Sequence, residues 1–572
     1  MGSFWKKPWV PLVVAFVVSL PALGTGFVLD DWMQRAIVRG QLPHAAWWDL
    51  YSFGDAKGVW LREALERGPF PWFTNPDLRL HFFRPLSSAL IALDTRVFGE
   101  LAWPQHLHSS LWYVALTAVV AALYRRLGLG VAALAALLFA IDDAHSLPVS
   151  WLANRNAILA VTFAWLGLLA HLRWREQGWA LGAWLSALAY GVALCAGETG
   201  VAALGYVFAY EVLGRRDALA VRARALVPMA AVLAVFAVIY VRVEAGARAS
   251  ATYIDPLAEP LVFLSVAPVR FLANVGGQTF GLPSDMWLSL PVLRPVLVGM
   301  GVVALVAWPL AWRRWRPADE AEVRTLKWLG LGALLSLVPT LATFPAGRLL
   351  TAPSLGVGAL VAALFSRAWG DRGWRRVLGV AWLGGAFVLQ PLSSWLTMPQ
   401  AFHAISERTV AAVKGAAVRE GEHVVVVSSE FAAAIYGVPV MMEYGLAVPA
   451  TWHIWSMAPL AHTLRRTGER EVELTVKDGR MIDSVFEQNF RNERHPMRVG
   501  QRVQLRGAAV TVLAVDRGLP TAIRVELEAP LETFHFLRWD GDGLARFELP
   551  PVGEALELAR GDTIFERLLG AR

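Results

Sequence analysis

Apolar segments of about 20 residues recur along the first two-thirds of this chain, and they limit its fold more than any other feature. A helix of that length crosses the hydrocarbon core of a bilayer. Hydrophobic residues make up 56% of the chain and charged residues 17%, whereas soluble proteins average roughly 45–50% and 25%. The sequence therefore predicts an α-helical polytopic membrane protein. We expect about eleven spans, at residues 10–29, 106–123, 130–141, 158–172, 179–196, 201–213, 226–243, 292–312, 328–344, 349–365 and 377–396.

Clusters of Arg and Lys occur at one side of these predicted spans. They are Lys6 with Lys7, Arg125 with Arg126, and the segments 173–175, 215–224, 313–316 and 367–376. Cytoplasmic loops of membrane proteins carry an excess of such residues. We therefore predict a protein of the cell inner membrane with a cytoplasmic N-terminus. The net charge of +7 belongs to these short loops, so it does not indicate a nucleic-acid partner.

The chain changes character near residue 399, where we place the boundary between a membrane domain, 1–398, and a C-terminal domain, 399–572. Residues 401–419 have helical spacing, and strand-like patterns follow at 423–428, 471–476, 503–505, 510–515 and 523–527. Asp540-Gly-Asp-Gly is a hairpin signal between 534–539 and 544–549. We predict an α+β domain with mostly antiparallel sheet. The span count places it on the extracytoplasmic side, which is the periplasm in a bacterial cell.

Two adjacent aspartates, Asp30 and Asp31, stand where the first apolar segment ends. Charges at a membrane boundary are costly and are often functional. A carboxylate there can abstract a proton or hold a metal ion. The alternative is that the pair merely ends the helix at the interface. The predicted topology places both residues on the outer side.

Other polar residues fall at the outer ends of the predicted spans. They are Asp142, Asp143, His145, Arg155, Glu198 and Arg348. Acidic residues contribute little to membrane orientation, so the positive-inside rule does not explain this grouping. A shared outward-facing site does explain it, with Arg348 suited to bind a phosphate. Residues 82–98, which include Arg84, are too charged to span, and we expect a surface helix there that helps to form a lipid groove.

Single residues of this set also have simpler interpretations. The positions of Asp142, His145 and Glu198, each taken singly, could simply reflect the preference of polar residues for the membrane interface. His81, His106 and His108 are more typical of histidines satisfied by nearby groups, because no companion ligand spacing accompanies them.

Five short motifs occur in order between residues 10 and 370. They are Phe-Val-Leu-Asp-Asp at 27–31; Phe-Arg-Pro-Leu at 83–86, followed by Phe-Gly at 98–99 and His-Leu-His at 106–108; the segment 138–151 with His145, followed by Asn154 and Arg155; Gly-Glu-Thr-Gly at 197–200; and Gly-Arg-Leu-Leu at 347–350, followed by Pro-Ser-Leu-Gly at 353–356. Together they resemble the C-type glycosyltransferases, which use polyprenyl-phosphate sugars. The resemblance is closest to the O-mannosyltransferase-like branch with tetratricopeptide tails.

This resemblance implies a C-type glycosyltransferase fold and an inverting hexosyl transfer. The sugar would pass from a polyprenyl-phosphate donor to a protein or glycan acceptor on the outer side, in contact with membrane lipids. Asp30 or Asp31 would act as the base, with Asp31 slightly favoured. Donor phosphate or substrate would be bound by Arg84, Asp143, His145, Arg155, Glu198 and Arg348. The wider fold varies in its use of metals, so a divalent metal ion stays open as a cofactor, with Asp31, Asp143 and His145 as candidate ligands.

The sequence also departs from the family pattern. Asp142-Asp143-Ala144-His145 replaces a His-Pro-x-His turn, and Gly197 stands where a Lys would precede Glu198. The tetratricopeptide tail is missing. Two other functions therefore stay open: a transporter or flippase of a lipid-linked saccharide, and an inactive relative that acts as a binding protein. The charges at span ends and the lack of a duplicated half are not typical of transporters.

Overall fold

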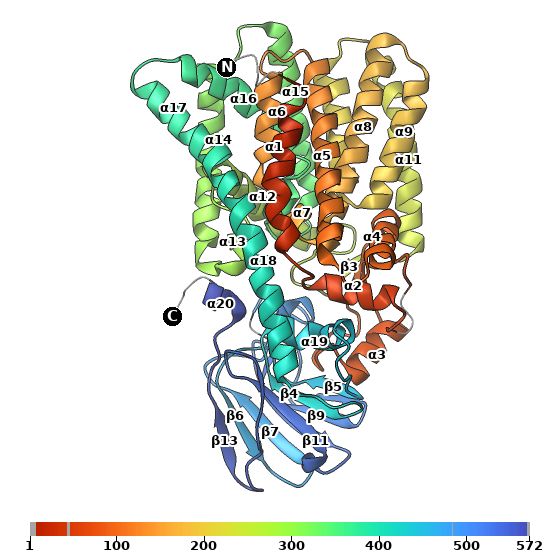
Figure 1. Ribbon diagram of the computed structural model, residues 1–572, viewed down its shortest axis with the longest axis vertical. Coiled ribbons are helices and arrows are strands. Elements are labelled where there is room, and N and C mark those ends of the chain that lie inside the picture. The colour runs from red at the N-terminus through yellow and green to blue at the C-terminus, as the bar shows by residue number, and fades with distance from the viewer. Residues whose placement is uncertain (1–6, 43–45, 483, 569–572) are drawn as a thin grey trace. The chain divides into compact units, whose positions relative to one another are not determined.

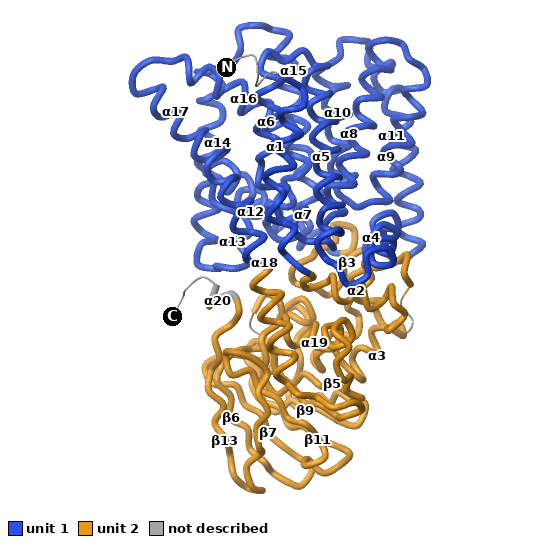
Figure 2. Tube along the Cα trace, in the orientation of Figure 1, with its two compact units in different colours: residues 1–26, 82–244, 259–402 blue, residues 27–81, 245–258, 403–572 orange. Residues whose placement is uncertain are grey.

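The computed structural model describes residues 7–42, 46–482 and 484–568, and Lys6 lies outside them. The chain divides into two compact units (Figure 2). Unit 1 comprises residues 1–26, 82–244 and 259–402, and unit 2 comprises 27–81, 245–258 and 403–572. Each unit is therefore assembled from three stretches of sequence.

Unit 1 is helical throughout its described part (Figure 1). Its principal helices are α1 (Val10–Ser19), α4 (Pro85–Phe98), α5 (Ala102–Arg126), α6 (Ala132–Ile141), α7 (Ser146–Ser150), α8 (Asn156–Gln177), α9 (Leu181–Ala196), α10 (Thr199–Ala209), α11 (Leu219–Arg242), α12 (Pro260–Phe280), α13 (Met286–Ser289), α14 (Arg294–Trp315), α15 (Glu320–Thr340), α16 (Ser354–Gly370), α17 (Trp374–Gly384) and α18 (Gln390–Gly415), which continues into unit 2. Short turns of helix join them: η2 (Leu20–Gly24), η3 (Asp143–His145), η4 (Leu152–Asn154), η5 (Tyr210–Gly214), η6 (Pro291–Leu293), η7 (Gly347–Leu350) and η8 (Gly385–Leu389).

Local sequence explains several helix ends in unit 1. Asp319 caps the start of α15, because its carboxylate accepts hydrogen bonds from two backbone N–H groups of the first turn. Gly178 and Gly281 end α8 and α12 in the left-handed conformation, which glycine adopts without a steric penalty. A helix is present within the segment 82–98, as α4.

Among the described residues, six helices are long and apolar enough to cross a membrane, or seven if the bent pair Ala132–Ile141 and Asp143–Ser150 forms one span. Four shorter apolar helices of unit 1 coincide with predicted spans: Val10–Gly24, Leu181–Ala196, Thr199–Gly214 and Ser354–Gly370. The expected total of about eleven is not confirmed.

Helix α12 is not among the predicted spans. It carries two polar residues, Arg270 and Asn274, and both side chains are buried in unit 1. The Arg270 Nη1 donates a hydrogen bond to the Leu341 carbonyl oxygen, 2.9 Å away. Packing against neighbouring helices thus removes these polar groups from lipid, and α12 is apolar enough to cross a membrane.

Unit 1 exposes apolar side chains that a soluble protein would bury. On α11, Val235, Val238 and Val241 are 60%, 60% and 68% exposed. The core instead holds large aromatic residues, such as Trp165 against Tyr206 at 4.9 Å between ring centroids. An apolar outer surface around a packed helical core is typical of a protein surrounded by lipid. The chain is therefore an integral membrane protein.

The described part of unit 2 contains three sheets. A three-stranded antiparallel sheet joins β1 (Ser52–Asp55), β2 (Arg79–His81) and β3 (Gly246–Arg248). A six-stranded antiparallel sheet has the order β13 (Ala555–Leu558), β6 (His462–Arg466), β7 (Glu471–Val476), β10 (Leu519–Leu527), β9 (Ala508–Asp516), β8 (Arg502–Leu505). The third has the order β12 (Leu544–Arg546), β11 (Phe534–Trp539), β4 (His423–Ser428), β5 (Thr451–Ile454), with β4 parallel to both neighbours.

The helices of unit 2 are α2 (Asp30–Val38), α3 (Val59–Arg67), α19 (Phe431–Glu443), α20 (Ile564–Leu568) and the end of α18, with short turns η9 (Glu487–Asn489) and η10 (Leu531–Thr533). The α+β prediction is confirmed by this mixture of helices and mostly antiparallel strands. The predicted hairpin is also present, since the Asp540 carboxylate accepts from the backbone N–H groups of Asp542 and Gly543.

Segments far from residue 399 are built into unit 2. Trp72 donates its indole N–H to the carbonyl oxygen of Trp455 at 2.9 Å, and Arg491 donates to the carbonyl oxygen of Phe73 at 2.6 Å. The boundary we placed at 399 lies close to the start of the last stretch of unit 2, at His403. However, a boundary drawn along the sequence cannot include the two earlier stretches.

Candidate active site

An acidic turn interrupts the helix pair α6 and α7 in unit 1. Asp142 ends α6, and its carboxylate accepts a hydrogen bond from the Ala144 N–H at 3.0 Å. A short side chain that caps the next turn competes with continued helix. The two helical segments are bent by 45° at this point. The Asp143 carboxylate accepts a hydrogen bond from Gln390 Nε2 at 2.9 Å.

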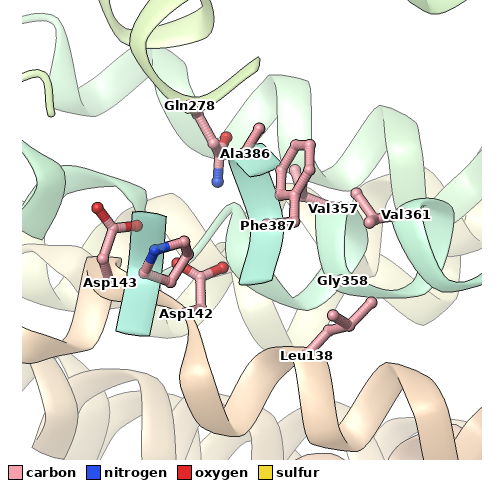
Figure 3. Close-up of a pocket in the computed structure, with 10 residues that line it drawn as sticks. Leu138, Asp142, Asp143, Gln278, Val357, Gly358, Val361, Ala386 and Phe387 are labelled. Carbon is pink, nitrogen blue, oxygen red and sulfur yellow. The ribbon is translucent and has the colours of Figure 1, made fainter. Parts of the chain in front are cut away.

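The two aspartates line a small cavity with Gln278 and Phe387 (Figure 3). Its volume is about 10 Å³, close to the minimum for one water molecule. The Gln278 Nε2 is buried and has no hydrogen-bond partner within the described part of the chain. A water molecule between this amide and the carboxylates would satisfy it. The cavity is too small for a sugar.

Arg348 lies in η7, beside a buried carboxylate. The Asp285 Oδ2 accepts a hydrogen bond from the Gly347 N–H at 2.9 Å. Burial raises the pKa of Asp285, and the Gly347 N–H and the Arg348 charge oppose that rise. The Arg348 guanidinium carbon is 5.3 Å from the ring centroid of Phe344 and 5.9 Å from that of Trp151. These contacts orient the guanidinium while leaving the residue only partly buried.

His145 is fully buried in unit 1. Its Nδ1 is 3.2 Å from the Asp142 carbonyl oxygen and 3.4 Å from the Tyr113 hydroxyl. Its Nε2 is 3.3 Å from the Ser354 hydroxyl. Both ring nitrogens thus have partners inside the protein. This arrangement favours a role in holding the acidic turn against α16.

Arg84 and Glu198 form an ion pair at 2.7 Å between Nε and Oε2. Arg84 precedes α4, and Glu198 precedes α10. The Ser87 hydroxyl donates to the Ala196 carbonyl oxygen at 2.7 Å and fixes α4 beside the end of α9. The Arg84 and Glu198 side chains are 19% and 28% exposed, so both can reach a ligand.

Arg155 is buried and bonded entirely within unit 1. Its Nη1 is 2.5 Å from the Asp94 carboxylate, and its Nε donates to the Ser109 hydroxyl at 2.8 Å. The His108 Nδ1 contacts the other Asp94 oxygen at 2.8 Å. Burial alone would raise the pKa of Asp94, but the His108 hydrogen bond and the Arg155 charge lower it. Arg155 therefore anchors α4 to α8.

We refer to these groups of unit 1 together as the polar layer. Trp151, which lies against Arg348, belongs to the same turn region as Arg155. Asn156 follows Arg155 and packs against Gly197, where an added Cβ would lie 3.3 Å from the Asn156 Nδ2. Four of the five sequence motifs therefore meet in unit 1, although they are spread along more than 260 residues.

Asp30 and Asp31 begin α2 in unit 2. The Asp31 Oδ2 accepts a hydrogen bond from the Val28 N–H at 3.1 Å, and the side chain is nearly fully buried. Asp30 is partly exposed, and its Oδ1 accepts a hydrogen bond from the Tyr436 hydroxyl at 2.6 Å. Leu29 has a φ of 53°, which side-chain-bearing residues rarely adopt. Strained backbone of this kind is enriched at functional sites.

A divalent metal ion needs several free oxygen or nitrogen ligands at one point. Asp31, Asp143 and His145 do not offer them, because each has partners within its own unit. Within residues 7–42, 46–482 and 484–568, no group of three or more His, Cys, Asp or Glu side chains could hold a metal ion.

Several polar residues of this layer were not predicted. Asp94 and His108 hold Arg155, although the sequence suggested only a surface-helix charge and a satisfied histidine. The sequence did contain a signal for Asp94, because a buried arginine such as Arg155 requires an anionic partner. Asp285, Gln278 and Gln390 belong to no motif, and only the fold brings them to Asp143 and Arg348. The simpler interpretation is confirmed for His81 and His106, which contact Asp49 and the Gly26 carbonyl oxygen.

Comparisons with known proteins show only weak structural similarity. No protein-family model matches the sequence, and the search of curated proteins found no match. The apo structure of ArnT from Cupriavidus metallidurans aligns with 77% of this chain and 88% of its own, at 12% identity and a TM-score of 0.39. The cryo-EM structure of the arabinofuranosyltransferase AftD from Mycobacteria aligns with 94% of this chain, at 15% identity and a TM-score of 0.37. This chain covers 40% of AftD. These scores are too low to assign a family.

Proposed function

We propose that this protein is a membrane glycosyltransferase of the C type, which transfers a hexose from a polyprenyl-phosphate donor to a protein or glycan acceptor. The observation that carries the proposal is the polar layer of unit 1. Residues of four motifs that resemble this class of enzyme contact one another there in pairs: Arg84 with Glu198, His145 with Ser354, and Arg348 with Trp151.

The chemistry of the proposed transfer matches these side chains. The acceptor oxygen attacks the anomeric carbon of the sugar while the bond from that carbon to the phosphate oxygen breaks. Polyprenyl phosphate leaves with the electron pair, and the single displacement inverts the anomeric configuration. Arg348 is the residue we assign to the departing phosphate, because a planar guanidinium binds phosphate oxygens in pairs. Arg84 and Glu198 are assigned to binding of the donor.

Asp30 is the residue we assign as general base. It would accept the proton of the acceptor hydroxyl as the new carbon–oxygen bond forms. The partial exposure of Asp30 supports this role, whereas Asp31 is buried and accepts a hydrogen bond from its own helix start. This choice reverses the slight preference for Asp31 drawn from the sequence. The Tyr436 hydroxyl would hold the Asp30 carboxylate in position.

We place the N-terminus in the cytoplasm and unit 2 on the extracytoplasmic side of the cell inner membrane. The basic residues that meet at one end of unit 1 support this orientation, among them Arg126, Arg175, Arg215 and Arg314. The polar layer then belongs to the outer half of the membrane domain. Donor and acceptor would both be consumed on that side.

An assay with a panel of radiolabelled polyprenyl-phosphate sugars tests the proposal. The purified full chain is incubated with each donor and with an acceptor fraction from the cell envelope. We expect release of polyprenyl phosphate with at least one donor. A protein that moves intact donor across proteoliposomes, without releasing polyprenyl phosphate from any donor, would be a flippase instead. A protein that binds donor but neither cleaves nor moves it would be an inactive relative.

A further inference from the structure

A second cavity, of about 630 Å³, lies at the other end of α6 from the acidic turn. We call it the basic-end groove. Parts of α1, α5, α6 and α16 form its walls, and all of them belong to unit 1. Its volume falls within the roughly 300–1,000 Å³ that is typical of small-molecule sites. None of the residues of the polar layer lines it.

Two cationic side chains, Lys7 and Arg125, line the basic-end groove, and both are exposed. Neither forms a salt bridge among the described residues. Their basic neighbours at this end do: Arg126 pairs with Glu176 at 2.8 Å, and Arg314 pairs with Asp371 at 2.6 Å. Among the described residues, the charges of Lys7 and Arg125 are therefore not neutralised by an ion pair, and the groove carries positive charge.

The start of α6 adds to this positive character. Residues 130–134 line the groove, and no side chain caps the helix. The first backbone N–H groups of a helix carry partial positive charge and bind anions. One carboxylate approaches this end of the groove: the Glu322 Oε1 would lie 3.6 Å from a Cβ added at Gly130, and its Oε2 lies 3.8 Å from Arg367.

The rest of the wall is apolar. Pro11, Leu134, Phe365 and Trp369 line it. Trp369 is 53% exposed, and tryptophan prefers the depth of the lipid headgroups. An anion that fits here must carry a hydrocarbon tail. Free phosphate or a nucleotide would leave the apolar wall uncovered.

We propose that the basic-end groove binds one anionic phospholipid from the leaflet at that end of unit 1. Its phosphate lies between Lys7 and Arg125, and an acyl chain covers Leu134 and Phe365. Basic pockets between membrane helices are known to select such headgroups. The lipid joins α1 to α6 and α16. This site does not depend on the proposed sugar transfer.

Native mass spectrometry of the full-length protein with added dioleoyl phosphatidylglycerol or dioleoyl phosphatidylcholine tests the site. We expect one tightly bound phosphatidylglycerol and no comparable binding of phosphatidylcholine. Lys7→Gln or Arg125→Gln should weaken phosphatidylglycerol binding about fivefold, and the double variant about thirtyfold. Equal binding of the two lipids, or unchanged binding to the double variant, would overturn the proposal.

Two further variants make the result specific. Arg313 is an exposed cation of α14 outside the groove, and Arg313→Gln should leave binding unchanged. If the double variant fails to fold, Ala133→Phe keeps both charges and fills the groove, and it should abolish binding of the single lipid. Polyprenyl phosphate is added as a competitor. Displacement of phosphatidylglycerol at equal concentration would assign the groove to a polyprenyl lipid and overturn our choice of occupant.

Discussion

At the scale of single residues, unit 1 uses its arginines in two ways. Arg155 is almost fully buried, and its guanidinium donates hydrogen bonds to Asp94, Ser109 and a backbone carbonyl oxygen. Arg348 is partly exposed, and its guanidinium lies near the rings of Trp151 and Phe344. The sequence grouped both as substrate-binding residues. The contacts favour Arg155 as a positioning residue and Arg348 as a ligand for phosphate.

Replacing one partner of the Asp94–Arg155 pair should strongly destabilise unit 1. Arg155→Met leaves a buried carboxylate without its cation, which costs about 3–5 kcal/mol. The double variant Asp94→Leu with Arg155→Met should recover much of that loss. Thermal unfolding of the full chain in detergent measures both effects. A single variant as stable as the parent would show that the pair does not hold α4 to α8.

Arg348→Gln should lower kcat/KM for the donor by roughly 10²–10³-fold, because it removes a charge aimed at the departing phosphate. Arg348→Lys should retain only part of the parent's kcat/KM, since an ammonium group lacks the planar fork of a guanidinium. Arg294→Gln is the matched control: Arg294 also contacts an aromatic ring, that of Trp287, at 5.3 Å. Equal losses in Arg348→Gln and Arg294→Gln would contradict a specific role for Arg348.

At the scale of elements, regular patterns in the sequence predicted what formed locally. The β-branched run at 423–428 is β4, and the alternating run at 471–476 is β7. Helix α19 was not predicted. It contains Pro439, and proline is not typical of a helix interior. Strands β1, β2 and β3 are only three or four residues long, too short for a period to show. They exist because distant segments pair with them.

The candidate site also contains residues that a local pattern predicts and residues that only the fold brings together. Motif residues such as Arg84 and Glu198 could be named from the sequence, and their pairing at 2.7 Å agrees with a shared site. Asp285 and Gln390 could not be named, because a single acid or amide in a loop or helix carries no pattern. Their positions depend on packing between segments far apart in the sequence: Asp285 contacts Gly347, 62 positions away, and Gln390 contacts Asp143, 247 positions away.

Glu430 should make the stability of unit 2 depend on pH. Burial raises its pKa to about 7, although the N–H groups of Ala433 and Ala432 oppose this. The folded state therefore holds a proton that the unfolded state, with a pKa near 4.5, releases. The resulting stability, about 3 kcal/mol, is present below pH 4.5 and is lost as the pH rises through 7.

Glu430→Gln mimics the protonated side chain and keeps an oxygen for the Ala433 N–H. Its thermal unfolding, followed by circular dichroism, should vary less between pH 5 and 8 than that of the parent. Glu420→Gln, at an exposed position of the same unit, should retain the parent's pH dependence. Parallel pH profiles of Glu430→Gln and the parent would disprove the assignment.

At the scale of the whole molecule, unit 2 is not a simple C-terminal domain. Its helix α2 is tied to α19 by Arg35, which donates to the Glu443 carboxylate at 2.7 Å in a buried pair. Gly68 lies so close to Trp452 that an added Cβ would be 2.2 Å from its carbonyl oxygen. The early segments thus complete the packing of the later ones.

A fragment of residues 403–572 should therefore fail to fold cooperatively. It would leave Glu443 without Arg35 and the Trp455 carbonyl oxygen without Trp72. Circular dichroism and thermal unfolding of the fragment measure this directly. As a control, the full chain with Trp72→Phe loses one hydrogen bond and part of a fully buried side chain, and it should still unfold cooperatively with a loss of about 2–4 kcal/mol. A sharp, native-like transition in the fragment would show that residues 403–572 fold by themselves.

The most direct test of the proposed function is the rate of polyprenyl-phosphate release in Asp30→Asn and Asp31→Asn variants. Asn keeps the size of each side chain but cannot take up a proton. We predict that Asp30→Asn lowers kcat by roughly 10²–10⁴-fold with little change in donor binding. Asp31→Asn, which keeps an oxygen for the Val28 N–H, should lower it far less. Release at the parent rate in both variants would contradict an aspartate base in this protein.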